Sequence, residues 1–149
     1  MNSTTAINAY NKVGIESEII GADPHKLISL LFRGALIEIA NAKNLILLKK
    51  TNAKGASITR VIAIIGEGLN ASLDKTVGGE LAHNLSSLYD YMVMRMVAAN
   101  VNNDIAALDE VANLLGELKE AWDTIRPNNM NTEQQQNAQG TTSRAYGSA

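Results

Sequence analysis

The chain has the length of a single domain, with 149 residues, 46% hydrophobic and 4% aromatic residues, and a formal net charge of −2. Few aromatic residues and many Leu, Ile, Val and Ala residues favour helices over strands. The slightly acidic balance argues against nucleic-acid binding by phosphate neutralisation. The sequence contains no cysteine, which excludes disulfides, zinc–thiolate sites and thiol catalysis.

Targeting and membrane signals are weak in this sequence. The longest apolar runs, at residues 45–48 and 61–65, are far too short to cross a bilayer. Residues 1–8 are polar and lack the basic and apolar regions of a secretory signal. We therefore expect a cytoplasmic protein that does not insert into a membrane.

The first element in chain order is an N-terminal arm at residues 1–22, interrupted by Gly14 and Gly21 and long enough for one short helix. Asp23 and Pro24 then begin the first clear helix, because Asp is a good N-cap and proline is tolerated at the first helical position. Helical spacing of apolar residues continues this helix over about 24–51. It should end near residues 51–55, because Asn52 and Gly55 disfavour a helix.

Three further helices are predicted over about 57–73, 80–101 and 104–125, with a loop at 74–79 that contains Gly78 and Gly79. The last helix stops before Pro127. Short connections between helices imply antiparallel neighbours, so residues 23–126 should form an all-α, antiparallel four-helix bundle. Residues 127–149 are rich in Asn, Gln, Ser, Thr and Gly, which predicts a disordered tail.

The predicted helices carry more apolar surface than one core needs. On the last helix the apolar residues fill an arc of roughly 200°, nearly double the stripe of a core-facing bundle helix. On the third helix, a stripe through Leu81, Leu85, Leu88, Met92 and Met96 is expected to face the core, and other apolar residues lie off that stripe. Large apolar surfaces of this kind mark interaction sites. They would be covered by a bound polypeptide, or by the chain's own arm and a homodimer partner.

Catalytic patterns are scarce, so no catalytic residue, cofactor or metal ligand is assigned. The acidic residues and the two histidines do not combine into the spacing of a metal site, and no phosphate-binding glycine loop is present. One alternative function is a histidine phosphotransfer module, because His83 lies on a predicted bundle helix. Ser86 and Ser87 stand where such a motif has a lysine and a glycine.

Several stretches of the sequence together resemble the flagellin-specific export chaperone family, FliS. The resemblance extends from about residue 6 to Pro127. Arg33 departs from the family pattern, which often has an acidic residue there, and the tail carries no family signature. The stretches that carry the resemblance are Ala9-Tyr10, Asp23-Pro24-His25-Lys26-Leu27 to Ala35, Gly68-Leu69 to Asp74, Gly78-Gly79-Glu80 to Leu85-Ser86-Ser87-Leu88-Tyr89-Asp90-Tyr91-Met92, Ala99-Asn100 to Asp104, and Glu110-Val111 to Trp122.

The resemblance implies a cytoplasmic helical bundle with no enzymatic activity. Family members bind the C-terminal segment of newly made flagellin, prevent its premature polymerisation and deliver it to the flagellar type III export apparatus. They also bind the export gate protein FlhA together with flagellin, and some bind the anti-sigma factor FlgM. The N-terminal arm is expected to cover the client-binding surface when flagellin is absent, with Ile7 and Tyr10 as the lid residues.

The candidate flagellin-binding residues are tyrosines of the third helix and apolar residues that lie off the expected inner stripes. Tyr89 borders the inner stripe and is also a candidate for the core, where its hydroxyl would need a partner. A client-free, self-associating bundle remains the alternative use of the same apolar residues. The candidates are Tyr89, Tyr91, Val93, Val97, Val101, Leu114, Leu118 and Ile125.

Overall fold

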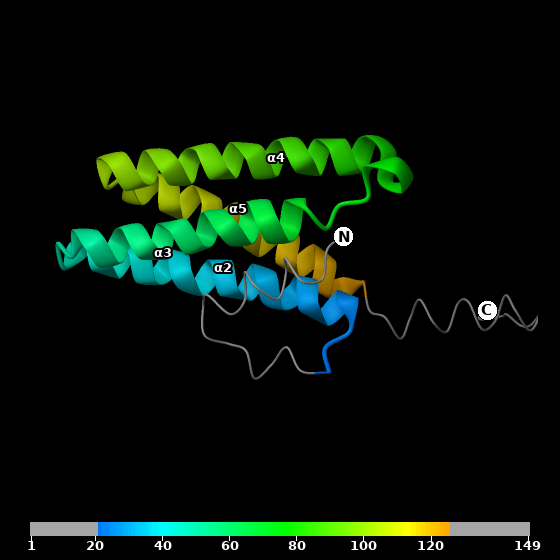
Figure 1. Ribbon diagram of the computed structural model, residues 1–149, viewed down its shortest axis with the longest axis horizontal. Helices are drawn as coiled ribbons and strands as arrows, with labels where there is room; N and C mark the ends of the chain where they lie inside the picture. Colours follow the sequence, from blue (N-terminus) through cyan, green and yellow to red (C-terminus); the bar gives the residue numbers. More distant parts are fainter. Residues whose placement is uncertain (1–20, 126–149) are drawn as a thin grey trace, which may run out of the picture.

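The structure, a computed structural model, describes residues 21–125 as four antiparallel helices. The expected lid residues Ile7 and Tyr10, and the expected disordered tail at 127–149, lie outside the described residues. Within the described part there is no strand, so the predicted all-α, antiparallel four-helix bundle is confirmed (Figure 1). The helices are α2 (Pro24–Leu47), α3 (Thr51–Ala63) with its π-helical continuation η2 (Ile64–Asn70), α4 (Lys75–Asn102) and α5 (Ile105–Thr124).

The helices are arranged so that each packs against its two neighbours around one core. Helix α2 contacts α3 and α5, and α4 contacts α5 and the α3–η2 helix on its other side. Apolar residues recur at helical spacing on each inner face, which is why these segments form helices that bury one side. The largest fully buried side chains are Leu30, Leu31, Ile39, Ile58, Ile64, Ile65, Leu69, Met92, Met96, Leu108 and Leu115.

Helices α2 and α5 begin at aspartate N-caps, and the first of these caps, Asp23, is the one that the sequence indicated. The Asp23 side chain accepts a hydrogen bond of 2.7 Å from the Lys26 amide, and Pro24 occupies the first turn of α2. The Asp104 side chain caps α5 by accepting from the Ala107 amide at 3.1 Å. Asn103, just before it, adopts the left-handed conformation that ends α4.

The turn between α2 and α3 differs from the prediction. The second helix begins at Thr51 rather than at about 57, and Gly55 lies inside it. Helix α2 ends at Leu47 in a Schellman motif, in which the Lys49 amide donates to the Ile46 carbonyl and the Lys50 amide to the Leu45 carbonyl. Lys49 takes the left-handed position (φ +59°) that glycine usually fills, so the sequence holds no glycine signal for this turn.

The predicted loop at 74–79 is mostly helical. Asp74 caps a first turn by accepting from the Thr76 and Val77 amides, and a kink at Gly79 (φ +57°) then separates this turn from the rest of α4. A positive φ suits glycine because it has no Cβ. Gly68 in η2 is needed for a different reason, since an added Cβ would lie 3.1 Å from the Leu31 side chain of α2.

Candidate protein-binding surface

One side of α4 presents leucines toward α5. Leu81, Leu88 and Arg95 are spaced seven residues apart and therefore share a helix face. Arg95 Nε donates to Glu110 Oε1 of α5 at 2.7 Å, which identifies this face as the one directed at α5. Leu85 lies beside Leu81 and Leu88 on the same face, so the first half of α4 turns a row of leucines toward α5.

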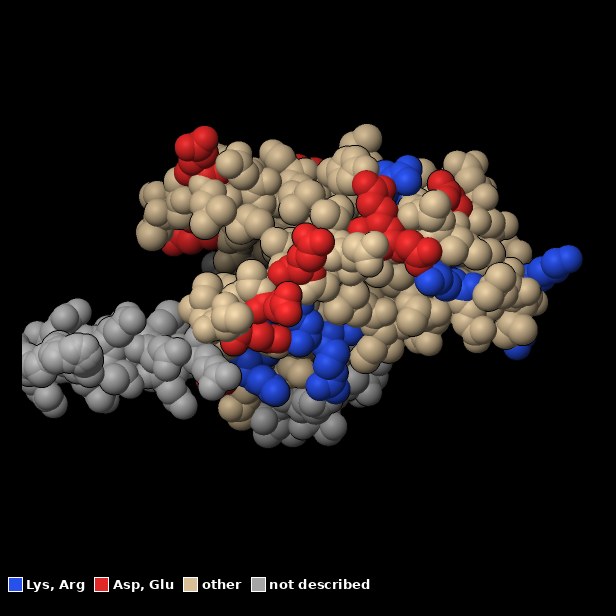
Figure 2. Space-filling view, turned by 180° about the vertical axis from the view of Figure 1, so that it is seen from behind, with Lys and Arg blue, Asp and Glu red and all other residues tan. Residues whose placement is uncertain are grey.

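These leucines become more exposed toward the start of α4. Leu88 and Leu85 are half-buried against the core, Leu81 is 68% exposed, and Val77 before the kink is 83% exposed. Increasing exposure along one face means that the two helices separate in this direction. Figure 1 shows α4 and α5 diverging toward the end at which α4 begins, and Figure 2 shows a hollow at that end of the molecule.

The facing side of α5 is apolar as well. Leu114 and Leu118 follow Glu110 at intervals of four residues, so they lie on the side of α5 that Glu110 directs at α4. Both are half-buried, and Ile125 at the end of the helix is 48% exposed. We define the α4–α5 apolar face as Leu81, Leu85 and Leu88 of α4 together with Leu114 and Leu118 of α5.

A polar cluster fastens the two helices where this face ends. The Tyr91 hydroxyl donates a short hydrogen bond to Glu110, which also receives the bond from Arg95. The hydrogen bonds from Tyr91 and Arg95 lower the pKa of the Glu110 carboxyl, and the bond to Glu110 raises the pKa of the Tyr91 hydroxyl. All three groups are near the surface, so this cluster fixes geometry more than it adds stability.

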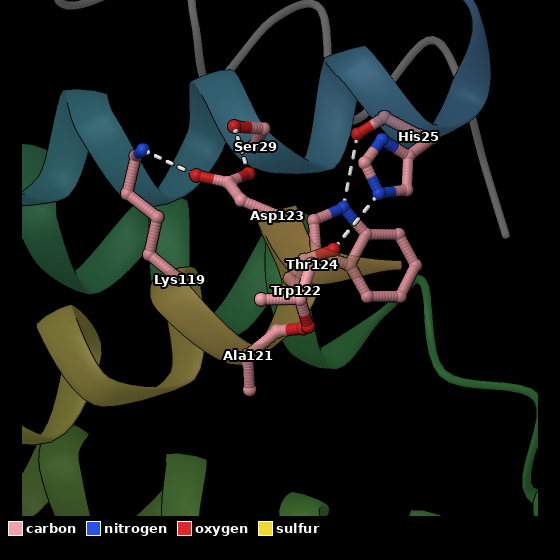
Figure 3. Close-up of polar contacts among 7 residues, drawn as sticks. All are labelled: His25, Ser29, Lys119, Ala121, Trp122, Asp123 and Thr124. Atoms are coloured by element: carbon pink, nitrogen blue, oxygen red, sulfur yellow. Dashed lines mark hydrogen bonds and ion pairs between the residues drawn. The ribbon is translucent and has the colours of Figure 1, made fainter. Parts of the chain in front are cut away.

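The end of α5 is held to α2 by a reciprocal contact. His25 Nε2 donates to the Trp122 carbonyl at 2.9 Å, and Trp122 Nε1 donates to the His25 carbonyl at 3.0 Å (Figure 3). The two rings stack with centroids 4.8 Å apart. The imidazole therefore adds a second donor to the Trp122 carbonyl in the last turn of α5, which also accepts from the Ile125 amide at 3.0 Å.

Next to the rings, Asp123 extends the same contact. It accepts from Ser29 Oγ at 2.7 Å and from Lys119 Nζ at 2.6 Å. Burial opposes ionisation of Asp123, but the bonds from Lys119 and Ser29 outweigh it and lower the pKa of this carboxyl. With its end fastened to α2 in this way, α5 is separated from the first half of α4.

The candidate flagellin-binding residues that the sequence predicted lie in separate parts of the structure. Tyr91, Leu114, Leu118 and Ile125 lie along or at the ends of the α4–α5 apolar face. The prediction that Tyr89 lies on the binding surface is corrected, because this residue is only 4% exposed and offers no surface to a partner. It lies in the core, where burial raises the pKa of its hydroxyl to about 12.

Val93, Val97 and Val101 occupy the other side of α4. Asp90, seven residues before Val97 and on the same face, accepts a bond from Asn70 of η2, so this face is directed at the α3–η2 helix. Val97 is 50% and Val101 76% exposed, and Val93 is half-buried. They form a separate apolar strip and do not converge with Leu114 and Leu118.

The sequence interpretation assigned Leu81, Leu85 and Leu88 to the core, and that assignment was wrong for Leu81. The core side of α4 runs instead through Ala82, Ser86 and Tyr89 before reaching Met92. A signal was present in the sequence: small residues at 82 and 86 suit close packing against neighbouring helices, and they lie about a third of a turn from the leucines.

Other chemistry finds little support in the described residues. His83 is exposed on α4, and the phosphotransfer hypothesis that rests on it stays a prediction. Residues 21–125 hold no group of three or more His, Asp or Glu side chains placed to bind a metal ion. No helix in this part of the chain has the length and apolar character of a membrane span.

Comparison with known proteins identifies a family. Residues 6–129 match the family model described as flagellar protein FliS. The flagellar secretion chaperone FliS of Salmonella typhimurium is 43% identical over 127 residues, which cover 85% of this chain and 94% of that protein. The flagellar secretion chaperone FliSB of Pseudomonas aeruginosa is 45% identical over 125 residues, covering 84% and 98%. The flagellar secretion chaperone FliS of Escherichia coli K12 is 36% identical over 122 residues, covering 82% and 90%.

Proposed function

The chain belongs to the FliS family of flagellar secretion chaperones, and on that premise we propose that it binds the C-terminal segment of flagellin in the cytoplasm. In this proposal it prevents premature polymerisation of flagellin and delivers it to the flagellar type III export apparatus. The role is binding and release, with no reaction catalysed.

The observation that carries this proposal is the α4–α5 apolar face. An amphipathic helix of a client would bury its apolar side against two diverging helices, with side chains spaced three and four residues apart as anchors. The face joins half-buried Leu85, Leu88, Leu114 and Leu118 to the exposed Leu81. The half-buried residues provide a pre-formed floor, and the exposed leucine leaves apolar area for the client to cover.

The size of the apolar contribution fits a complex that forms and later releases its client. Burying about 1,000 Å² of apolar surface yields a gross term of roughly 25 kcal/mol at 25 cal/mol per Å². Ordering of the client segment and loss of rigid-body freedom consume much of that term. The net affinity then depends on the few side chains at the centre of the interface.

Further partners follow from the family resemblance. We propose that the arm at residues 1–22, with Ile7 and Tyr10, covers the client-binding surface in the absence of flagellin. FlhA is proposed to bind the chaperone–flagellin complex, and FlgM to be a second flagellar partner. The Val93, Val97 and Val101 strip is a second apolar surface that a long client segment would reach by wrapping around α4.

The test is calorimetric titration of a flagellin C-terminal fragment into the full chain and into a version without residues 1–18. We expect a saturable 1:1 complex and a gain of helical circular dichroism from the fragment. Binding that strengthens on deletion supports the arm as a competing lid, whereas unchanged binding removes the lid and keeps the chaperone. Absence of binding at micromolar concentrations in both versions refutes the proposal.

The same samples separate the alternatives. A client-free bundle predicts a stable homodimer, detected by sedimentation, whose formation Leu81→Ser weakens. A phosphotransfer module predicts that a phosphorylated receiver or a small phosphodonor labels the chain, and that His83→Ala abolishes the label.

A further inference from the structure

A cavity lies at the end of the bundle opposite the open α4–α5 end. It has a volume of about 370 Å³ and is formed where the α2–α3 turn meets the α4–α5 turn. Leu45 and Ile46 give it an apolar wall, and three lysines, Lys49, Lys50 and Lys54, line the remainder together with Thr51 and Asn103. Among residues 21–125, no carboxylate lines it.

Lys54 is the most informative of these residues because it is buried. Its side chain donates from Nζ to the Asn100 carbonyl and to Asn103 Oδ1, both at 2.7 Å, and the residue is only 4% exposed. Among residues 21–125 no carboxylate forms an ion pair with it. An ammonium has three donors and both recorded partners are neutral, so a buried positive charge is left without an opposite charge.

The start of α3 adds donors to the same cavity. Lys50 is the N-cap residue of α3 and no side chain caps the helix, so the amides of its first turn have no side-chain acceptor. Thr51, in that turn, lines the cavity. Lys49 and Lys50 are exposed and form no ion pair within the described part of the chain. Three ammonium groups and the positive end of a helix therefore lie around one cavity, and no carboxylate of the described helices neutralises them.

We infer that this lysine cavity, lined by Leu45, Ile46, Lys49, Lys50 and Lys54, is a docking site for an acidic segment of a partner protein. The segment carries one or two carboxylates next to an apolar side chain. A carboxylate there neutralises the lysines and accepts hydrogen bonds from the α3 amides. The apolar side chain packs on Leu45 and Ile46.

A peptide fits this site better than an anionic membrane surface does. The donors and the apolar wall line a concave space with room for a few side chains, whereas a bilayer contacts convex surfaces. Leu47 and Leu48, which are 69% and 55% exposed beside the cavity, extend the apolar surface for residues that flank the carboxylates. The site is remote from the α4–α5 apolar face, so a partner bound there would not compete with a client on that face.

The test is an NMR titration of the full chain with the peptide acetyl-Asp-Leu-Glu-Leu-amide, using acetyl-Asn-Leu-Gln-Leu-amide as the uncharged control. We expect saturable shifts of the Thr51, Asn52 and Ala53 amides, with a Kd of about 1 mM for so short a ligand. The variant Lys49→Gln/Lys50→Gln should weaken binding about tenfold, since each exposed ion pair contributes a few-fold. Lys75→Gln, at the other end of the bundle, should leave it unchanged.

Three results would overturn the inference. One is the absence of saturable shifts at these amides up to about 10 mM peptide, roughly ten times the expected Kd. Another is equal binding of the uncharged peptide. The third combines two observations: the chain sediments with phosphatidylglycerol vesicles unless Leu47 is replaced by Ala (Leu47→Ala), and its amides do not respond to the peptide. That result would assign this end of the bundle to a lipid surface.

Discussion

Leu81→Ala should weaken client binding while leaving the fold nearly intact. Full burial of a leucine side chain contributes about 1.5 to 3 kcal/mol. Leu81 is 68% exposed in the free chain, so only about a third of that contribution, below about 1 kcal/mol, supports the fold. The remainder, about 1 to 2 kcal/mol, becomes available when a client covers the residue, and its loss corresponds to a roughly 5- to 30-fold higher Kd.

Leu47 supplies a matched control for this experiment. It is the same side chain on a helix, 69% exposed, but lies at the other end of the bundle. Leu47→Ala should therefore change the unfolding free energy as little as Leu81→Ala does and leave flagellin binding unchanged. The measurements are calorimetry with the flagellin C-terminal fragment and urea unfolding followed by circular dichroism.

The result that refutes the reasoning is equal binding by the two variants. If both bind the fragment as the parent chain does, Leu81 lies outside the interface and the α4–α5 apolar face loses its assignment. If both weaken binding equally, the client contacts both ends of the bundle. A fall of several kcal/mol in the stability of Leu81→Ala would show that this leucine supports the core, as Leu108 does.

Three predictions concern the fold itself. Lys49→Gly should raise the unfolding free energy by about 1 kcal/mol, because glycine adopts the left-handed conformation of this residue without strain. Urea titration measures this free energy, and a variant less stable than the parent chain would contradict the turn geometry. Gly79→Ala should lower the unfolding free energy by about 1 to 3 kcal/mol, because the backbone at Gly79 (φ +57°, ψ −132°) is strained for a residue with a Cβ, although the added Cβ meets no atom within 4 Å. Below about pH 4 the unfolding free energy should fall, because Asp123 has a lowered pKa when folded and the unfolded chain binds its proton first. Asp123→Asn should flatten that pH dependence in thermal melts, and an unchanged slope would refute the assignment.

Periodicity and capping were sufficient to predict the bundle, because these signals are local. Asp23 and Asp104 begin helices by accepting hydrogen bonds from amides three residues ahead, which a sequence displays directly. The end of α2 was not predictable in the same way. Lys49 takes a left-handed conformation for which lysine has no preference, so the sequence carries no signal for this turn and the expected boundary was misplaced toward Gly55.

The candidate surface was only partly predictable from sequence, because it depends on how far two helices separate. Helical spacing places Leu81, Leu85 and Leu88 on one face of α4 whether they lie in a core or in the open. Their exposure follows from long-range contacts, such as His25 with Trp122, which are 97 residues apart. Leu114 and Leu118 were identified because the apolar arc of α5 was too wide for one core.

The separation of α4 from α5 has an identifiable physical origin. Helix α5 bonds to α4 through Glu110 near its start, and it bonds to α2 near both ends, through the ion pair of Asp109 with Lys43 and through Trp122 and Asp123. Because α5 is held to α2 at both ends and to α4 near its start, it does not cover the beginning of α4, where Leu81 is 68% exposed. The residues that fasten the end of α5 to α2 therefore help to set the width of the α4–α5 apolar face.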